Sequence, residues 1–537
     1  MSWRGELWAS QLGLNNSVEC CYRMSGASLK SKVAKGAVWT LLEKMSTQIV
    51  GFVVGMILAR LLTPNDYGTV ALTGIFFAVA GVLVDGGFGI ALIQKKDADD
   101  LDFNSVFYLN LALSAVAYLA LFLAAPWIAN FYKTPELKVI VRVSAICLLF
   151  NAVNAIQGAE LTKKMLFHLS FRISLITCFT SAVCGITLAF LGYGVWALVW
   201  SSLITGFVGV IARWFIIAWR PRLMFSFNRL KPLFSYGWRM CVSNLIDQFF
   251  VHINDLLIGR FYTKTDVAYV NKGRSLPNLA MNEVDATLGR VSLPAFVLLQ
   301  DDKEKLRDAM RRMIQCSTFL VFPLMVGIAA CSYSVLRLLY GPQWTPATPY
   351  MMLACFTFAL WPFHTINLRG IIALGRSDVF LKLEVIKKTA CLVVIISSFR
   401  LGVLPWMIIS AFALGPFGLL VNTWPNKRLL GYTIGMQLRD VMPTALICIA
   451  EALVVFGIDI AGNSIKSTFG VADEGASLMV FLSVKLVLQF VIGAGTFFSL
   501  AYAFRLKPLG EYAKMAAGVV RGRCPGIAAA LERRFAV

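Results

Sequence analysis

Residues 57–72 read ILARLLTPNDYGTVAL, and residues 257–272 read LIGRFYTKTDVAYVNK. Each stretch ends one apolar segment of the chain and begins the next one. Aligned without a gap, the two stretches share four residues, which are Arg60 with Arg260, Thr63 with Thr263, Asp66 with Asp266, and Val70 with Val270. We interpret them as one connection repeated in two related halves of the chain; the alternative is a chance similarity between two short turns.

Composition places the whole chain in a membrane. Its 537 residues are 58% hydrophobic and 15% charged, whereas about a quarter of a soluble protein is charged. A membrane-spanning helix needs about 20 mainly apolar residues. The sequence therefore predicts an all-α integral membrane protein with about 14 transmembrane helices. The predicted spans are 38–61, 68–93, 104–127, 138–158, 170–191, 194–218, 236–259, 266–297, 313–333, 348–373, 378–399, 401–424, 440–460 and 475–503.

The chain has a net charge of +21, and its basic residues are distributed unevenly along the sequence. Lys and Arg are concentrated in alternate connections between the predicted spans, including the stretch 219–239 and the tail 505–537. This positive-inside pattern predicts that both termini are cytoplasmic. The basic charge then lies against anionic membrane lipids, and no nucleic-acid partner is needed to explain it.

The repeat and the spans together predict two lobes of six helices, related by a parallel pseudo-twofold axis, followed by a helix pair. Translation is expected to start at either Met1 or Met24. The predicted parts are a cytoplasmic N-terminal segment (1–35), an N-lobe (36–219), a basic cytoplasmic linker (220–235), a C-lobe (236–430), a helix pair (431–504) and a basic cytoplasmic tail (505–537).

Polar residues recur on single helical faces of several predicted spans, spaced mainly three or four residues apart. They are Asn271, Arg274, Asn278, Asn282 and Asp285 in 266–297, Asn244, Asp247, Gln248 and Asp255 in 236–259, Glu43 and Gln48 in 38–61, and Asp85 in 68–93. A charge within the bilayer costs at least ~2.5–3.5 kcal/mol, so these faces predict a hydrated cavity between the lobes. The alternative for each face is a salt-bridge network that only holds helices together. Pro277 is expected to interrupt its helix.

Motifs for catalysis and for metals are not apparent in the sequence. It has no GxxxxGK[ST] phosphate loop, no HExxH and no GxSxG. The twelve cysteines form no CxxC pair, so we expect no metal, no cofactor and no disulfide framework. The short connections leave little room for an extracytoplasmic catalytic loop, which disfavours a membrane glycosyltransferase or polymerase. We therefore expect a transporter and not an enzyme.

Five stretches resemble the polysaccharide exporters of the multidrug/oligosaccharidyl-lipid/polysaccharide (MOP) superfamily. They are LVDGGFGIALIQKKDAD (83–99), NSVFYLNLALSAVAYLALFLAAPWIANFY (104–132), NDLLIGRFYTKTDVAYVNKGRSLPN (254–278), SLPAFVLLQDDKEKLRDAMRRM (292–313) and LLYGPQWTPATPYMMLA (338–354). The resemblance covers about residues 30–440 and is nearest to the Wzx-like lipid-linked oligosaccharide flippases of the colanic acid exporter type. The lipid II flippases are related but fit these stretches less well.

This resemblance implies a flippase that works by alternating access. Its cargo would be an undecaprenyl-diphosphate-linked oligosaccharide, moved from the cytoplasmic to the periplasmic leaflet, with a polysaccharide polymerase and export machinery as further partners. Arg274 is the first candidate to bind the diphosphate, because guanidinium suits phosphate, and Lys272 is the second. The other substrate-binding candidates are Asn278, Asn282, Asp285, Asn244, Asp247, Gln248 and Asp255.

The main alternative from the same superfamily is a multidrug or metabolite antiporter driven by Na⁺ or H⁺. Its coupling site would use a buried carboxylate such as Asp85 or Asp247, with Glu43 and Gln48 as further cavity residues. The repeated connection contributes gate or rim residues in either case, namely Arg60, Asp66, Arg260 and Asp266. For the two arginines the alternative is simple snorkelling at the membrane interface.

Overall fold

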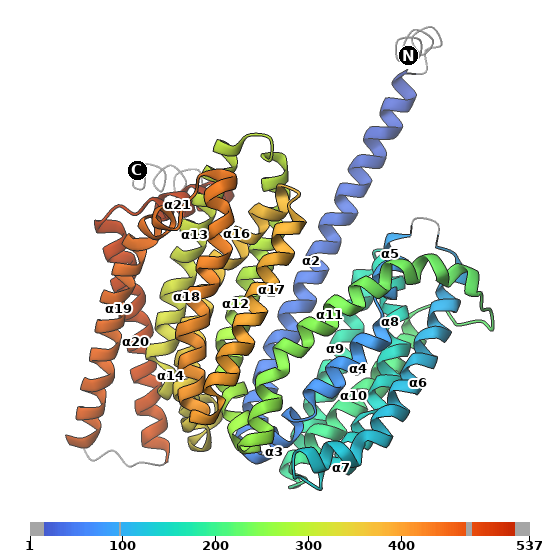
Figure 1. Cartoon of the computed structure of the whole chain (residues 1–537), viewed down its shortest axis with the longest axis horizontal. Coiled ribbons are helices and arrows are strands. Elements are labelled where there is room, and N and C mark those ends of the chain that lie inside the picture. Colours follow the sequence, from blue (N-terminus) through green and yellow to red (C-terminus); the bar gives the residue numbers. More distant parts are fainter. Residues whose placement is uncertain (1–14, 96–97, 469–474, 521–537) are drawn as a thin grey trace. The chain divides into compact units, whose positions relative to one another are not determined.

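The computed structural model of the chain describes residues 15–95, 98–468 and 475–520 (Figure 1). These residues form α-helices and two short 3₁₀ helices, without a strand in the ranges given, so the predicted all-α class is confirmed. Contacts divide the chain into two compact units, Met1–Lys264 (unit 1) and Thr265–Val537 (unit 2).

Unit 1 is built around the helices α6, α8, α9 and α10. In it α2 packs on α9, α9 packs on α10, α6 packs on α4, α7 and α8, and α11 packs on α4, α5 and α6. The helices are α2 (Asn15–Leu61), α3 (Pro64–Ala71), α4 (Gly74–Asp85), α5 (Phe88–Gln94), α6 (Asp100–Phe131), α7 (Leu137–Ser144), α8 (Ile146–Lys163), α9 (Phe167–Phe190), α10 (Val195–Ile216) and α11 (Phe227–Phe261).

A polar cluster fixes one end of α6. The Asp99 carboxylate accepts a hydrogen bond from the Asp102 N–H at 2.9 Å, which holds the pKa of Asp99 below its usual value. Lys95 lies 2.5 Å from Asp102, and Arg229 lies 3.2 Å from Asp99. Acidic side chains suit a helix N-terminus, because unpaired N–H groups point toward them. The cluster therefore ties the start of α11 to the start of α6.

Two predicted spans of unit 1 are broken in the structure. The span 68–93 is divided among α3, α4 and α5, and the span 138–158 is divided between α7 and α8. Gly86 and Gly87, between α4 and α5, have φ of 52° and 73°, a region that glycine enters without steric cost. The prediction of one continuous helix over 68–93 was therefore wrong, because hydropathy does not register this turn.

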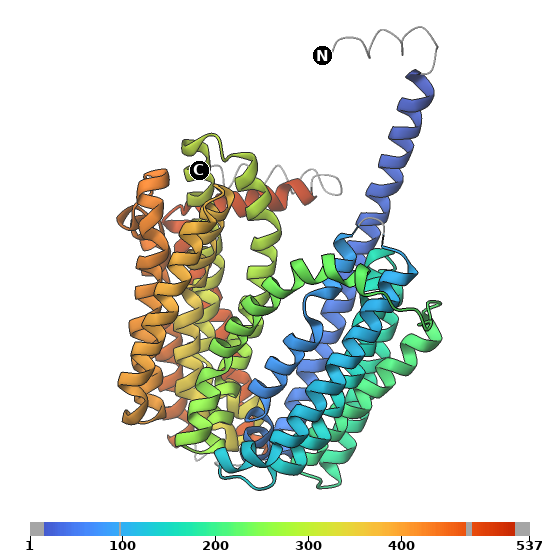
Figure 2. The same cartoon turned by 45° about the vertical axis from the view of Figure 1, so that its right-hand side comes forward.

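Unit 2 is arranged around α13, which packs on α15, α16, α18, α19, α20 and α21. In both views α21 lies across the end of the bundle and not along it (Figures 1 and 2). The elements are α12 (Lys264–Leu298), α13 (Lys303–Ala330), α14 (Ser332–Tyr340), η1 (Pro342–Ala347), α15 (Thr348–Ala359), α16 (Trp361–Ala373), α17 (Ser377–Ser398), η2 (Phe399–Leu401), α18 (Val403–Leu430), α19 (Ile434–Thr468), α20 (Ala476–Ala503) and α21 (Lys507–Val520).

Both apolar and polar buried side chains hold the helices of unit 2 together. One apolar cluster contains Phe296, Phe363 and Tyr432, and a second contains Phe319 and Phe497. A buried polar group lies between α16, α18 and α19, where the amides of Asn367, Gln437 and Asn426 are joined by hydrogen bonds of 2.7–2.9 Å. Such partners are necessary because an unpaired polar group in an apolar interior is costly. The expected interruption at Pro277 is not found, because α12 continues through it.

Among the described residues, eleven helices or helix groups are long and apolar enough to cross a membrane. They cover eleven of the fourteen predicted spans. The other three predicted spans coincide with α11, α12 and α17, which are helices of sufficient length whose polar residues lower their hydropathy. The protein is thus a multi-pass membrane protein, while the count of 14 stays a prediction.

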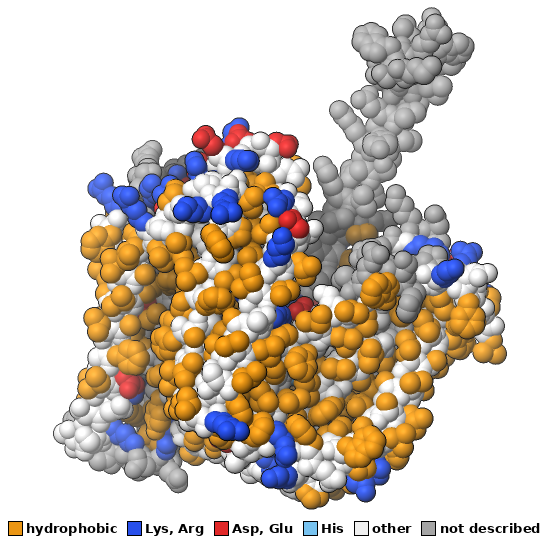
Figure 3. Space-filling model, in the orientation of Figure 1, with side chains coloured by type: hydrophobic (Ala, Val, Ile, Leu, Met, Phe, Trp, Pro, Cys, Tyr) orange, Lys and Arg blue, Asp and Glu red, His pale blue; other side chains and the backbone are white. Residues whose placement is uncertain are grey.

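The outer surfaces of both units suit a lipid environment. Figure 3 shows hydrophobic side chains over the flanks, with Lys and Arg gathered toward the ends. On unit 2 the exposed apolar residues include Leu381, Val393 and Ile396 of α17 and Phe412 of α18. A soluble protein rarely exposes apolar surface so extensively, so these faces contact lipid.

The division by contacts differs from the predicted repeat. Unit 1 extends to Lys264 and includes α11, whereas the predicted linker is 220–235 and the predicted C-lobe begins at 236. A repeat concerns internal similarity and not contact density, so the predicted lobes stay a prediction. Residues 1–14 of the predicted N-terminal segment and 521–537 of the predicted tail lie outside the described residues.

Candidate substrate-binding surfaces

The clearest polar surface of unit 2 lies on α12. Arg274, Asn278 and Asn282 are exposed, while Gly273 and Pro277 are buried. The three exposed residues follow one another at intervals of four, so they occupy one side of the helix. Their predicted place on a common face agrees with the structure, and their role in binding stays a prediction.

Lys272 is held by aromatic rings of its own unit. Its ammonium lies 3.8 Å from the centroid of Tyr340 and 5.3 Å from that of Trp344. Gly273 permits this arrangement, because a Cβ there would lie 2.8 Å from Tyr350 Cβ and 2.9 Å from Met351 N. Such cation–π contacts stabilise a partly desolvated ammonium. Lys272 is therefore positioned by α14 and η1, on a different side of α12 from Arg274, which follows it by two residues.

Asp285 ends the polar face with an ion pair. Its Oδ1 accepts a hydrogen bond at 2.9 Å from Nη2 of Arg369, on α16. Nη1 of Arg369 also lies 3.4 Å from Ser292 Oγ. This pair links α12 to α16, so Asp285 has a structural partner in addition to its predicted role toward substrate.

In unit 1 the predicted residues of α11 fall at two places. Asp247 is exposed and Asn244 and Gln248 are partly buried, whereas Asp255 is buried, with its Oδ2 3.5 Å from His252 Nδ1. The predicted common face therefore separates into an accessible part and a buried part.

Asp85 belongs to the end of α4 that packs on α11. Cys241 of α11 donates from Sγ to the Val82 carbonyl at 3.7 Å, and the Asp85 side chain is exposed. Asp85 and the accessible part of α11 therefore lie on neighbouring helices of unit 1.

Glu43 takes part in a network inside unit 1. Its Oε1 accepts a hydrogen bond at 2.5 Å from Ser174 Oγ of α9. Nearby, Arg213 Nη1 of α10 donates to Asn154 Oδ1 of α8 at 3.0 Å. Gln48 is partly buried one turn further along α2. One hydrogen bond links α2 to α9 and the other links α8 to α10, which is the structural alternative considered for such polar faces.

A family profile described as "Polysaccharide biosynthesis protein" matches residues 57–349, more than half of the chain and including α12 with its polar face. The chain belongs to this family.

Similarity to known proteins extends over most of this chain. It is 24% identical to the teichuronic acid biosynthesis protein TuaB of Bacillus subtilis, over 85% of this chain and 96% of TuaB. It is 27% identical to the succinoglycan biosynthesis transport protein ExoT of Rhizobium meliloti, over 60% and 65%, respectively. It is 23% identical to the lipopolysaccharide biosynthesis protein WzxC of Escherichia coli, over 67% and 74%.

Solved structures agree on the fold. The lipid II flippase MurJ, in an inward closed conformation, matches with a TM-score of 0.67 at 13% identity, over 87% of this chain and 98% of MurJ. An inward-facing multidrug resistance MATE family transporter of the MOP superfamily matches with a TM-score of 0.56 at 16% identity, over 73% and 98%. The family member therefore has the MOP transporter fold, as the sequence predicted.

In its first copy, the repeated connection caps the N-terminus of α3. Asp66 Oδ2 accepts hydrogen bonds from the Thr63 N–H at 3.0 Å and from Thr63 Oγ1 at 2.7 Å, and the Asp66 N–H points back to Thr63 Oγ1. Arg260 lies 5.2 Å from the centroid of Phe131. The predicted contact of Arg60 with Asp66, and the gate role of Asp266, stay predictions.

Two charged residues outside the predicted polar faces form hydrogen bonds between helices. Arg213 and Arg369 lie within apolar helices and bind partners on neighbouring ones. An isolated arginine in an apolar span is a signal that could have identified both, because such a residue is costly without a partner.

Proposed function

We propose that this member of the polysaccharide biosynthesis protein family is a flippase for a lipid-linked oligosaccharide. It takes an undecaprenyl-diphosphate-linked repeat unit from the cytoplasmic leaflet to the periplasmic leaflet of a bacterial inner membrane, by alternating access. The names of ExoT, a transport protein for succinoglycan biosynthesis, and of WzxC, a lipopolysaccharide biosynthesis protein, support a cargo of this class. The cargo stays intact during transport, so the proposed activity involves no covalent chemistry.

The exposed polar face of α12 carries the proposal. Arg274 offers a planar, permanently charged group that suits phosphate oxygens, and Asn278 and Asn282 offer amides that donate to and accept from sugar hydroxyls. From Arg274 to Asn282 the helix rises about 12 Å. A diphosphate and the first sugars attached to it can therefore contact the same face together.

The proposal also includes the surroundings of the cargo. Lys272, fixed by its aromatic neighbours, adds positive charge two residues before Arg274 and favours an anionic headgroup over a cationic drug. A polymerase and export machinery would receive the cargo outside the membrane. Asp247 of α11 and Asp85 of α4 would bind sugar hydroxyls or a coupling ion.

The test uses a bacterial strain in which this chain is the only exporter of a surface polysaccharide. We expect Arg274→Ala to weaken headgroup binding roughly 10- to 100-fold, because a charge-assisted hydrogen bond is lost. Surface polysaccharide should fall, and lipid-linked repeat units should accumulate on the inner leaflet. Arg274→Lys should restore part of the export.

Arg290→Ala is the matched control, because Arg290 is also exposed on α12 but lies about 24 Å further along the helix than Arg274. Immunoblots of the membrane fraction correct for protein abundance. Normal export by Arg274→Ala would refute its diphosphate role. If Asp85→Asn abolished export while Arg274→Ala did not, an ion-coupled antiporter would be the better account.

A further inference from the structure

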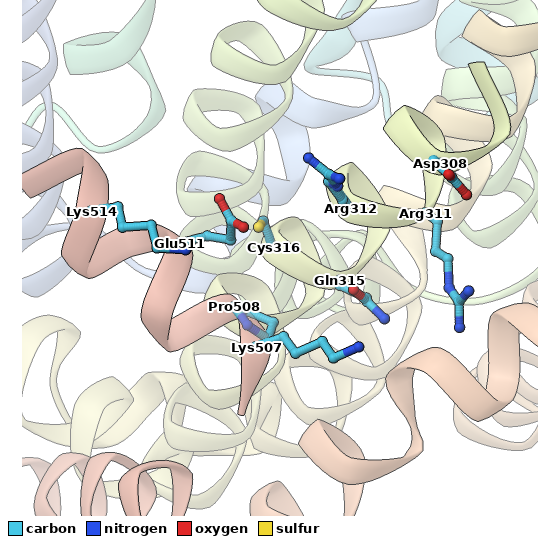
Figure 4. A pocket seen from close by; sticks show the side chains of 9 residues that line it. All are labelled: Asp308, Arg311, Arg312, Gln315, Cys316, Lys507, Pro508, Glu511 and Lys514. Atoms are coloured by element: carbon cyan, nitrogen blue, oxygen red, sulfur yellow. The ribbon is translucent and has the colours of Figure 1, made fainter. Parts of the chain in front are cut away.

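A basic pocket opens at one end of unit 2, between the first turns of α13 and the helix α21. It has a volume of about 510 Å³. Figure 4 shows side chains of α13 on one wall and of α21 on the other. The lining residues are Asp308, Arg311, Arg312, Gln315, Cys316, Lys507, Pro508, Glu511 and Lys514.

An apolar groove of about 850 Å³ continues from this basic pocket. The two share Arg311, Gln315, Lys507 and Pro508. On α19 the groove is lined by Met442, Leu446 and Ala450, which recur every four residues and so follow one side of the helix for about 12 Å. Leu500 of α20 and Phe504, directly after that helix, also line the groove. Met442, Leu446 and Phe504 are exposed large hydrophobic residues, so the groove can accommodate a long apolar ligand.

Positive charge exceeds negative charge around the pocket and the groove. Six basic side chains line them, Arg311, Arg312, Arg439, Arg505, Lys507 and Lys514, against three carboxylates, Asp308, Asp440 and Glu511. Asp440 is already engaged by Arg311 at 2.5 Å and by Tyr432 Oη at 3.0 Å.

The helix α21 is a fixed wall of the pocket. Tyr512 stacks on Phe319 of α13 with ring centroids 6.0 Å apart, and its hydroxyl donates to the Cys316 carbonyl at 3.1 Å. Burial raises the pKa of Tyr512 to about 12, so the donating proton is retained at neutral pH. Ala513 and Ala517 are also buried. The helix α21 is therefore fixed against α13, and its basic residues keep their place beside the pocket.

Arg505 occupies an unfavourable backbone position at the mouth of the groove. Its φ is 49°, in the left-handed region that glycine usually occupies after a helix. The N–H of Leu506 donates to the Ala501 carbonyl at 3.0 Å, which closes α20 with this turn. The turn places Arg505 between α20 and α21, where it lines the groove.

We propose that the pocket and the groove together bind one anionic phospholipid of the surrounding leaflet. The headgroup phosphate lies among Arg312, Arg505 and Lys507, and an acyl chain lies in the groove between α19 and α20. Basic pockets between membrane helices bind anionic headgroups, and a soluble phosphate would have no use for the adjoining groove. The site is separate from the polar face of α12 and does not depend on the cargo proposed above.

The experiment measures thermal unfolding of the full-length protein in mixed micelles. Phosphatidylglycerol should raise the Tm of the wild type more than the same amount of phosphatidylcholine does, and added salt should weaken the difference. The double variant Arg312→Gln/Lys507→Gln should lose at least half of the phosphatidylglycerol-dependent shift. The control Lys427→Gln/Arg428→Gln makes the same charge change on exposed residues outside the pocket, and it should keep the shift.

Arg505→Gly separates binding from folding. Glycine relieves the left-handed turn, so the Tm in lipid-free micelles should stay the same or rise, while the shift with phosphatidylglycerol falls. Equal shifts in the wild type, in the double variant and in Arg505→Gly would overturn the proposal. A shift that inorganic phosphate alone reproduces would also overturn it, because the site would then recognise an anion and not a lipid.

Discussion

The Asp285–Arg369 pair connects α12 to α16 just beyond the exposed polar face. We expect Arg369→Ala to lower the free energy of unfolding by roughly 1.5–3 kcal/mol, because the partly buried carboxylate loses a charged hydrogen-bond donor. Thermal unfolding in detergent measures this loss. Arg290→Ala, which changes an exposed arginine on α12, should leave the Tm almost unchanged.

A double-mutant cycle isolates the pair. Asp285→Ala/Arg369→Ala should cost less than the sum of the two single changes, because each single change leaves one charge without its partner. Strict additivity of the three Tm changes would mean that the two side chains are not coupled. The pair would then have no part in positioning α12.

Helix capping accounts for the similarity between residues 57–72 and residues 257–272. In the first copy, Thr63 and Asp66 form a reciprocal capping box at the start of α3. Thr263 and Asp266 have the same spacing at the start of α12, so the sequence predicts the same cap there. We expect Asp66→Ala and Asp266→Ala each to lower the free energy of unfolding by about 1 kcal/mol, measured by thermal unfolding.

Asn65→Ala provides the control for the first copy, because Asn65 is an exposed polar residue in the same turn. It should cost much less than Asp66→Ala. If only Asp66→Ala destabilises the protein, the common aspartate of the two copies does not reflect a common cap. The repeat would then need another explanation.

The periodicity of the sequence predicted the helices, but it did not predict which side chains on different helices contact one another. Every predicted span coincides with helical structure, because the length and composition of an apolar run are local properties. The turn at Gly86–Gly87 and the continuity of α12 through Pro277 depend on surrounding packing, so the sequence did not predict them. In the same way the spacing predicted the exposed face of Arg274 and Asn278. It could not predict that Arg369, distant in the sequence, binds Asp285.

At the scale of the whole molecule, the number of crossings decides where the two termini lie. In the described part of the chain, eleven helices or helix groups meet the length and hydropathy requirements. An odd number of crossings would put the termini on opposite sides of the membrane. Adding α11, α12 and α17 gives fourteen crossings and cytoplasmic termini, in agreement with the distribution of Lys and Arg. The polar helices must then cross with their polar faces turned away from lipid.

The helix α17 offers the most direct test of fourteen crossings. It packs along α18, which is apolar enough to span the membrane, so we expect α17 to cross beside it. A short epitope tag inserted at Gly375, before α17, should be inaccessible to antibody in intact spheroplasts and accessible after permeabilisation. A tag at Gly402, after α17, should be accessible in intact spheroplasts. Both glycines lie in short connections between helices, where a Cβ on Gly375 would meet no atom within 4 Å and one on Gly402 would meet only Pro405, at 3.5 Å. This favours tolerance of an insertion, and export of polysaccharide checks that each tagged protein folds. Equal accessibility of the two tags would mean that α17 does not cross, and the cytoplasmic assignment of one terminus would then be wrong.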